Sequence, residues 1–239
     1  MRPLIIKLFF LVFCCSCDGQ NACDEEPSHF GNATYYYFNP TKQVGSCSFN
    51  NAKITPFLVG AMNTKEYGKA DYCGACVEIQ GPKGSVKVKI VDQCPGCKPG
   101  DIDLNAEAFD SIASRAQGRV AISWKVVPCE STEPLVFHFI KTSNEWWASV
   151  QIRNHSNPIA KLEFWKDSVY TEIPRRTHNY FTMKNMGIGP HTYRLTDVYG
   201  NEIIEENVPF ARTESTQQFP VCGFKAEVQE EIVEEEDVE

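Results

Sequence analysis

The apolar residues of this 239-residue chain fall in short runs of strand length, and this pattern most limits the folds open to it. In the first half the runs are rich in β-branched and aromatic residues and cover 33–37, 76–79, 86–91 and 120–127. Gly81-Pro82-Lys83-Gly84 separates two of them, as a hairpin turn would. Only Ala106–Ala113 has helical spacing, with Asn105 at the N-cap position. The first half therefore predicts a small β-barrel with one short helix.

The second half has the same pattern without a segment of helical period. Its strand candidates are 135–140, 146–153, 160–166, 169–173, 191–197 and 202–206. Asp167-Ser168 and Tyr199-Gly200-Asn201 lie where hairpin turns are needed. We therefore expect an all-β chain with a barrel domain at 23–129, a linker beside prolines at 130–134 and a β-sandwich domain at 135–224.

The two ends of the chain differ from its interior. Residues 1–17 combine a basic start, a short apolar run and small residues, which is typical of a secretory signal peptide too short to span a bilayer. Residues 227–239 carry eight acidic side chains and no basic one, so the remainder has 23 acids against 23 Lys and Arg. We expect a secreted, extracellular protein with no membrane attachment in its mature form and an acidic disordered tail at 225–239. The balanced remainder has no basic stripe that would bind nucleic acid.

The cysteines fit an exported protein. Three of the eleven lie in the signal segment, and the other eight are Cys23, Cys47, Cys73, Cys76, Cys94, Cys97, Cys129 and Cys222. An even number in an oxidising compartment predicts up to four disulfides, whose connectivity the sequence does not set. Two Cys-x-x-Cys pairs separated by seventeen residues also fit the spacing of a zinc ribbon. Secretion favours disulfides over zinc, so we expect no metal, and no cofactor motif is present.

Residues 91–105 hold the densest chemistry of the sequence. Asp103 lies between Ile102 and Leu104, so an extended segment turns it, with Asp101, away from the core. Asp92 ends a strand candidate, where a carboxylate can face a cleft. The alternative is that Asp92 and Asp101 cap turns beside Pro and Gly.

Two of these carboxylates raise the question of glycoside hydrolysis. That reaction normally needs one carboxyl as acid and a second as base or nucleophile, and Asp103 and Asp92 are the candidates. No Asp or Glu occurs between Glu26 and Glu66, so the early strand at 33–37 offers no second carboxylate. The sequence therefore lacks a base at that position.

The paired tryptophans form the second informative feature. Strand alternation puts Trp147 on a polar face, where an exposed indole is suited to stacking on a sugar ring, and puts Trp146 on the apolar face. Nearby, Asn154-His155-Ser156 is a sequon for N-glycosylation, as is Asn32-Ala33-Thr34. Both sequons overlap segments with other candidate roles, so we assign a glycan to neither.

An ordered series of motifs resembles one family along residues 30–210. The motifs are Gly31-Asn32-Ala33-Thr34-Tyr35-Tyr36, Cys73-Gly74-Ala75-Cys76, Val91-Asp92, Asp101-Ile102-Asp103-Leu104, Ile122-Ser123-Trp124-Lys125, Trp146 to His155 and Leu195-Thr196-Asp197-Val198-Tyr199-Gly200. Together they resemble microbial expansins, and the order makes the resemblance specific. It implies a six-stranded double-psi β-barrel, related to family 45 endoglucanases, followed by an immunoglobulin-like β-sandwich that binds cellulose.

The resemblance also implies roles for individual residues. Asp103 matches the essential acid-like aspartate, and Thr34 and Asp92 match polar residues of the same groove. Trp146 and Trp147 match two of three aromatics in a cellulose-stacking platform, which for Trp146 overrules the alternation. The third aromatic position falls near His178 and Tyr180, one of which must replace it. Cys94 stands where bacterial members carry a tyrosine, so we expect a disulfide in place of a phenol on the groove floor.

These inferences favour a secreted protein that loosens wall polysaccharides without hydrolysis. Its expected partner is cellulose or another β-glucan, and we expect it to act as a monomer that is not an enzyme. Two alternatives remain open: a weak glycoside hydrolase or lytic transglycosylase that uses Asp103, and a plain carbohydrate-binding matrix protein.

Overall fold

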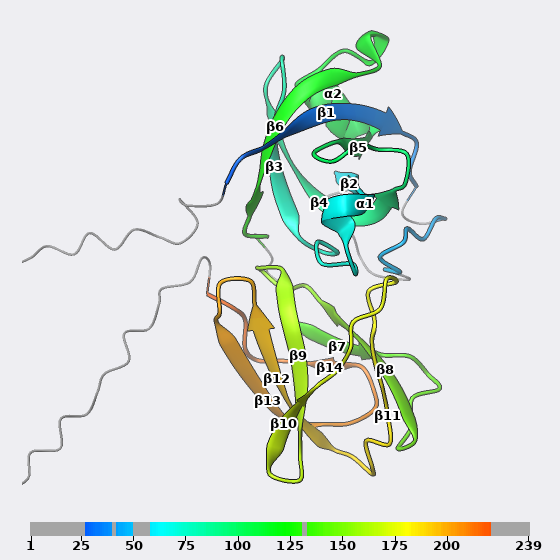
Figure 1. Ribbon diagram of the computed structural model, residues 1–239, viewed down its shortest axis with the longest axis vertical. Coiled ribbons are helices and arrows are strands. Elements are labelled where there is room, and N and C mark those ends of the chain that lie inside the picture. Colours follow the sequence, from blue (N-terminus) through cyan, green and yellow to red (C-terminus); the bar gives the residue numbers. More distant parts are fainter. Residues whose placement is uncertain (1–26, 40–41, 50–57, 131–132, 221–239) are drawn as a thin grey trace, which may run out of the picture.

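The computed structural model describes residues 27–39, 42–49, 58–130 and 133–220, which form two β-structured bodies stacked along the long axis of the molecule (Figure 1). The predicted signal peptide, Cys23, Cys222 and the acidic tail lie outside the described residues. Within the described part of the chain, no helix is long and apolar enough to cross a membrane.

The first body is a closed six-stranded barrel with the strand order β1-β5-β2-β4-β3-β6. Its strands are β1 His29–Tyr36, β2 Val59–Asn63, β3 Cys76–Gln80, β4 Ser85–Cys94, β5 Ile102–Asn105 and β6 Val120–Val127. The pairs β1/β5 and β2/β4 are parallel and the other pairs are antiparallel. Alternating burial along β6 shows the usual barrel rule, in which every second side chain enters the core. The predicted barrel is thus confirmed, although β2 was missed.

Short helices accompany the barrel strands. They are α1 Thr64–Tyr67, α2 Ala106–Ile112 and the 3₁₀ helix η2 Arg115–Gln117, so the expectation of one helix was wrong. The predicted helix is α2, and Asn105 does occupy its N-cap position without capping it through its side chain. Asn105 Oδ1 instead accepts the backbone N–H of Val59 at 3.0 Å, which ties β5 to the start of β2.

The second body is a sandwich of two four-stranded sheets, β10-β9-β12-β13 and β11-β8-β7-β14 (Figure 1). The strands are β7 Val136–Phe139, β8 Trp147–Arg153, β9 Ile159–Lys166, β10 Val169–Glu172, β11 Phe181–Lys184, β12 His191–Asp197, β13 Glu202–Val208 and β14 Thr213–Glu214. The predicted turn at Asp167-Ser168 joins β9 to β10, and both residues have the positive φ of 50° and 65° that tight hairpins need. The all-β prediction is confirmed, and the sequence analysis missed β11 and β14.

Three disulfides join described cysteines: Cys47–Cys73, Cys76–Cys129 and Cys94–Cys97. The two Cys-x-x-Cys motifs therefore behave differently, because only the second closes on itself. Among the described residues there is no cluster of side chains that could hold a metal ion. The disulfide prediction is confirmed for these six cysteines.

Hydrogen bonds connect the barrel to the sandwich. Gln151 Nε2 on β8 donates to the carbonyl of Cys47 at 2.8 Å, and the hydroxyl of Tyr67 in α1 donates to the carbonyl of Thr177 at 2.6 Å. His155 lies fully buried nearby, and burial lowers its pKa to about 3, so it stays neutral. Gln151 is itself fully buried. The barrel thus covers the end of a sheet face that the sequence pattern predicts to be exposed.

Candidate functional site

Four residues form one row across the barrel wall. Thr34 on β1 is paired with Asp103 on β5, Asp103 with Ala61 on β2, and Ala61 with Asp92 on β4. Paired residues on neighbouring strands share a face, so all four side chains point to the same side. Asp103 faces outward as predicted, because its neighbours Ile102 and Leu104 are fully buried in the core. The structure therefore brings Thr34, Asp92 and Asp103 together.

Asp103 is held in a half-buried position beside Thr34. The hydroxyl of Thr34 donates to Asp103 Oδ1 at 2.5 Å. Burial raises the pKa of Asp103, and the negative charge of Asp92 raises it further, while the bond from Thr34 works in the opposite direction. A carboxyl with a raised pKa can hold a proton, which suits it to donate to a sugar oxygen.

Asp92 has a more fixed arrangement. Its Oδ1 accepts the backbone N–H of Ser46 at 2.7 Å and of Gln93 at 2.8 Å. These bonds join β4 to the loop that carries Ser46 and agree with the alternative in which Asp92 caps a turn. The other carboxylate oxygen receives no hydrogen bond from the described residues and remains able to accept one.

Ala61 lies between the two aspartates and was not identified from the sequence. It is 3% exposed. Its methyl group is a small, apolar side chain between Asp92 and Asp103. No signal pointed to it, because the sequence analysis assigned no strand to residues 59–63.

Asp101 corrects the sequence analysis. It was expected to face away from the core, but it is 4% exposed. Its Oδ1 accepts the backbone N–H of Asn32 at 2.7 Å, and its Oδ2 forms an ion pair with Arg119. Although burial acts to raise it, the hydrogen bonds from Asn32 and the charge of Arg119 lower the pKa of Asp101 below its usual range. Asp101 thus joins β1 to the start of β5 and takes no part in the outward row.

Cys94 closes its disulfide with Cys97 at the end of β4, two residues beyond Asp92. Both sulfurs belong to partly exposed residues. The expected disulfide therefore lies at the edge of the row. Asn63 at the end of β2 is the cross-strand neighbour of Cys94.

The tryptophans lie at the exposed start of β8. Trp146 is 69% exposed, so the alternation that placed it in the core was wrong. The reason is that β8 begins at Trp147, and both backbone N–H groups donate to Asn144 Oδ1, which forms a turn before the strand. Trp147 is half-buried on the outer face of the sheet, opposite the core residue Ala148. Both indoles are thus open to the surface.

His178 and Tyr180 have different environments. His178 is exposed, whereas Tyr180 is 7% exposed and cannot offer a ring face to a polysaccharide. Their ring centroids lie 5.6 Å apart. His178 follows Thr177, whose carbonyl accepts from the barrel residue Tyr67. Of the two candidates for the third aromatic position, only His178 has a suitable surface.

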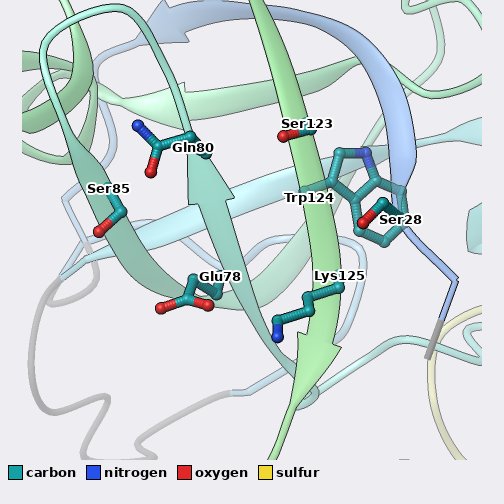
Figure 2. A pocket seen from close by; sticks show the side chains of 7 residues that line it. All are labelled: Ser28, Glu78, Gln80, Ser85, Ser123, Trp124 and Lys125. Carbon is teal, nitrogen blue, oxygen red and sulfur yellow. The ribbon is translucent and has the colours of Figure 1, made fainter. Parts of the chain in front are cut away.

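A polar hollow lies elsewhere on the barrel, on the outer side of β3, β4 and β6 (Figure 2). It is lined by Ser28, Glu78, Gln80, Ser85, Ser123, Trp124 and Lys125. Glu78 and Lys125 are cross-strand neighbours, and the Trp124 indole donates to the carbonyl of Gly100 at 2.8 Å. None of the predicted site residues lines this hollow.

Comparison with known proteins agrees with this architecture. A family model described as lytic transglycolase matches residues 31–124, which lie within the barrel. Expansin-YoaJ of Bacillus subtilis is 29% identical over 213 residues, which cover 87% of this chain and 89% of that protein. An expansin of Clavibacter michiganensis, a mutant solved in complex with cellohexaose, superposes with a TM-score of 0.74 at 27% identity over 82% of this chain and all of that one.

The chain is similar to expansins along most of its length. The similarity extends to Expansin-like protein 2 of Dictyostelium discoideum, which is 29% identical over 218 residues covering 84% of this chain and 50% of that protein. Since the Clavibacter structure is matched along its full length, the similarity includes both the barrel and the sandwich.

Proposed function

We propose that this chain is an expansin-like extracellular protein that loosens a plant-type wall by gripping β-glucan chains, without hydrolysing them. Thr34, Asp92 and Asp103 bind the hydroxyl groups of one chain, and Trp146, Trp147 and His178 hold the protein on a cellulose surface. Cellohexaose in the related Clavibacter structure supports a cellulose-like ligand.

The observation that carries the proposal is a hydrogen-bonded connection between the aromatic platform, which consists of Trp146, Trp147 and His178, and the row of Thr34, Asp103, Ala61 and Asp92. Trp147, Ser149 and Gln151 follow one another on the outer face of β8, and Gln151 donates to the carbonyl of Cys47. The preceding residue, Ser46, donates its backbone N–H to Asp92. A short path through the protein therefore links a glucan bound at the row to a cellulose surface bound at the platform. A force that acts on one ligand is transmitted along this path to the other.

The nonhydrolytic part of the proposal is supported by the absence of a carboxylate beside Asp103 on β1. The position beside Asp103 on β1 is Thr34, a neutral donor that cannot act as a base. Asp92 already accepts two backbone hydrogen bonds on one oxygen. The energy for loosening must then come from binding.

A second candidate function is cleavage by a weak hydrolase or lytic transglycosylase. The family model carries the description lytic transglycolase, and the raised pKa of Asp103 is what a single general acid needs. This candidate requires new chain ends, which the first one excludes.

The test compares wild type with Asp103→Asn on strips of cellulose paper under constant load, with soluble reducing ends measured in the same tubes. Asp167→Asn is the matched control, because Asp167 is exposed in a hairpin turn with φ of 50°, which Asn tolerates. We expect wild type and the control to weaken paper without sugar release and Asp103→Asn to bind paper without weakening it. Sugar release that disappears with Asp103→Asn would establish cleavage, and paper that none of the three proteins weakens would leave a binding protein.

A further inference from the structure

The hydroxyl of Tyr36 feels the charge of both aspartates. Tyr36 follows Thr34 by two residues on β1, so both side chains lie on the same face. Its cross-strand partner is Asn105, two residues beyond Asp103 on β5. The ring is braced by Phe38, with centroids 5.7 Å apart. The tyrosine thus extends the row of Thr34 and Asp103 by one step along the barrel wall.

The hydroxyl of Tyr36 is buried and has no hydrogen-bond partner in the structure. Such a group is costly to leave unpaired and calls for an explanation. Burial raises the pKa of Tyr36 above its ordinary value, and the charges of Asp92 and then Asp103 raise it further. The phenol therefore keeps its proton and is a hydrogen-bond donor near two carboxylates.

Each of the two carboxylates has one oxygen that can accept a hydrogen bond from the Tyr36 hydroxyl. Asp103 accepts from Thr34 through Oδ1, and Asp92 accepts from Ser46 and Gln93 through Oδ1. No described residue donates to the second oxygen of either group. One unpaired donor and two unpaired acceptors thus lie on the same face of the barrel wall, where a direct hydrogen bond or one bridging water can pair them.

We propose that Tyr36 is a positioning residue of this groove, whose hydroxyl donates to Asp103, directly or through one water, and holds the carboxylate in the orientation that binds a glucan hydroxyl. A neutral donor also reduces the repulsion between Asp103 and Asp92. The orienting role for the glucan rests on the proposed function, whereas the hydrogen bond to Asp103 does not.

The experiment measures the pKa of Asp103 by NMR titration of its carboxyl carbon in the full-length protein. Tyr36→Phe removes only the hydroxyl, and Tyr35→Phe is the matched control, because Tyr35 lies on the opposite face of β1 and packs on Phe109 at 5.1 Å. Loss of a donor destabilises the charged form, so we expect the pKa of Asp103 to rise by about one pH unit in Tyr36→Phe and to stay unchanged in Tyr35→Phe. Paper weakening should fall in parallel in Tyr36→Phe alone.

An unchanged pKa of Asp103 in folded Tyr36→Phe would overturn the proposal, even if weakening fell, because the tyrosine would then act only through packing. If Tyr36→Phe did not fold, the hydroxyl proton of Tyr36 in wild type decides: a downfield, slowly exchanging signal supports the hydrogen bond, and its absence refutes it. Failure of the proposed function is distinguishable, since it shows as wild type that does not weaken paper while the pKa of Asp103 still responds to Tyr36→Phe.

Discussion

The three disulfides should differ in their contributions to stability, because they close loops of very different length. Their sequence separations are 53 residues for Cys76–Cys129, 26 for Cys47–Cys73 and 3 for Cys94–Cys97. The chain-entropy relation then gives about 4.1, about 3.5 and about 1.6 kcal/mol for the free energy of unfolding contributed by each. Removal of the Cys94–Cys97 disulfide should therefore lower the free energy of unfolding least, by about 2 kcal/mol less than removal of Cys47–Cys73.

The perturbation is the paired replacement of each disulfide by alanines. Cys76 and Cys129 are 7% and 4% exposed, so their loss also removes buried packing, whereas Cys94 and Cys97 are partly exposed. Both effects act in the same direction. We thus expect the Cys94→Ala, Cys97→Ala protein to lose about 1.6 kcal/mol and the Cys76→Ala, Cys129→Ala protein to lose clearly more.

Urea unfolding of the full-length proteins, followed by tryptophan fluorescence without reductant, measures the free energy of each. Mass spectrometry of unreduced digests is the control that the other disulfides remain intact. A Cys94→Ala, Cys97→Ala protein that loses as much stability as the Cys76→Ala, Cys129→Ala protein would refute the reasoning from loop length. If the expected order holds, the disulfide next to Asp92 can be removed to test its role in the groove on a folded protein.

Three further predictions concern single residues. Asp101→Asn should lower the free energy of unfolding by about 1–3 kcal/mol at pH 7. Since the folded pKa of Asp101 lies below its ordinary value of 3.8, this difference should be present above that pH and disappear as the pH falls through the folded pKa, as thermal melts from pH 7 to pH 2 can show. Trp146→Ala should weaken sedimentation with microcrystalline cellulose about fivefold to tenfold, whereas Trp165→Ala, on an indole 46% exposed on the other sheet, should not; equal losses would place the binding surface elsewhere. Asn154 should carry no glycan after secretion from a eukaryotic host, because its side chain donates to the carbonyl of Pro134 and Ser156 of the same sequon is buried; a peptide map that shows glycan there would contradict this.

Local alternation and turn chemistry were enough to predict the all-β class, most strands and the outward direction of Asp103. A side chain's face on a strand depends only on its neighbours in sequence, and Ile102 and Leu104 fix it here. The missed strand β2 is five residues long and fully buried, so it shows no alternation of apolar and polar residues. Its identity as a strand depends on pairing with β4 and β5, which no local pattern records.

What a side chain lies against was decided by the tertiary structure alone. Asp101 follows the same alternation as Asp103, yet Asn32 and Arg119, distant in sequence, cover it and make it a buried acceptor. Strand alternation predicts that Gln151 is exposed on a polar face, yet the barrel loop at Cys47 buries it.

The same division explains the site. The sequence by itself predicted that Thr34, Asp92 and Asp103 lie on one outward face. It also determined that the first strand carries no carboxylate beside them. Only the folded barrel showed that Ala61 separates the aspartates and that Tyr36 holds a buried, unpaired hydroxyl beside them. Side-chain direction is set along one strand, whereas the distance between groups depends on the registers of four strands closed into a barrel.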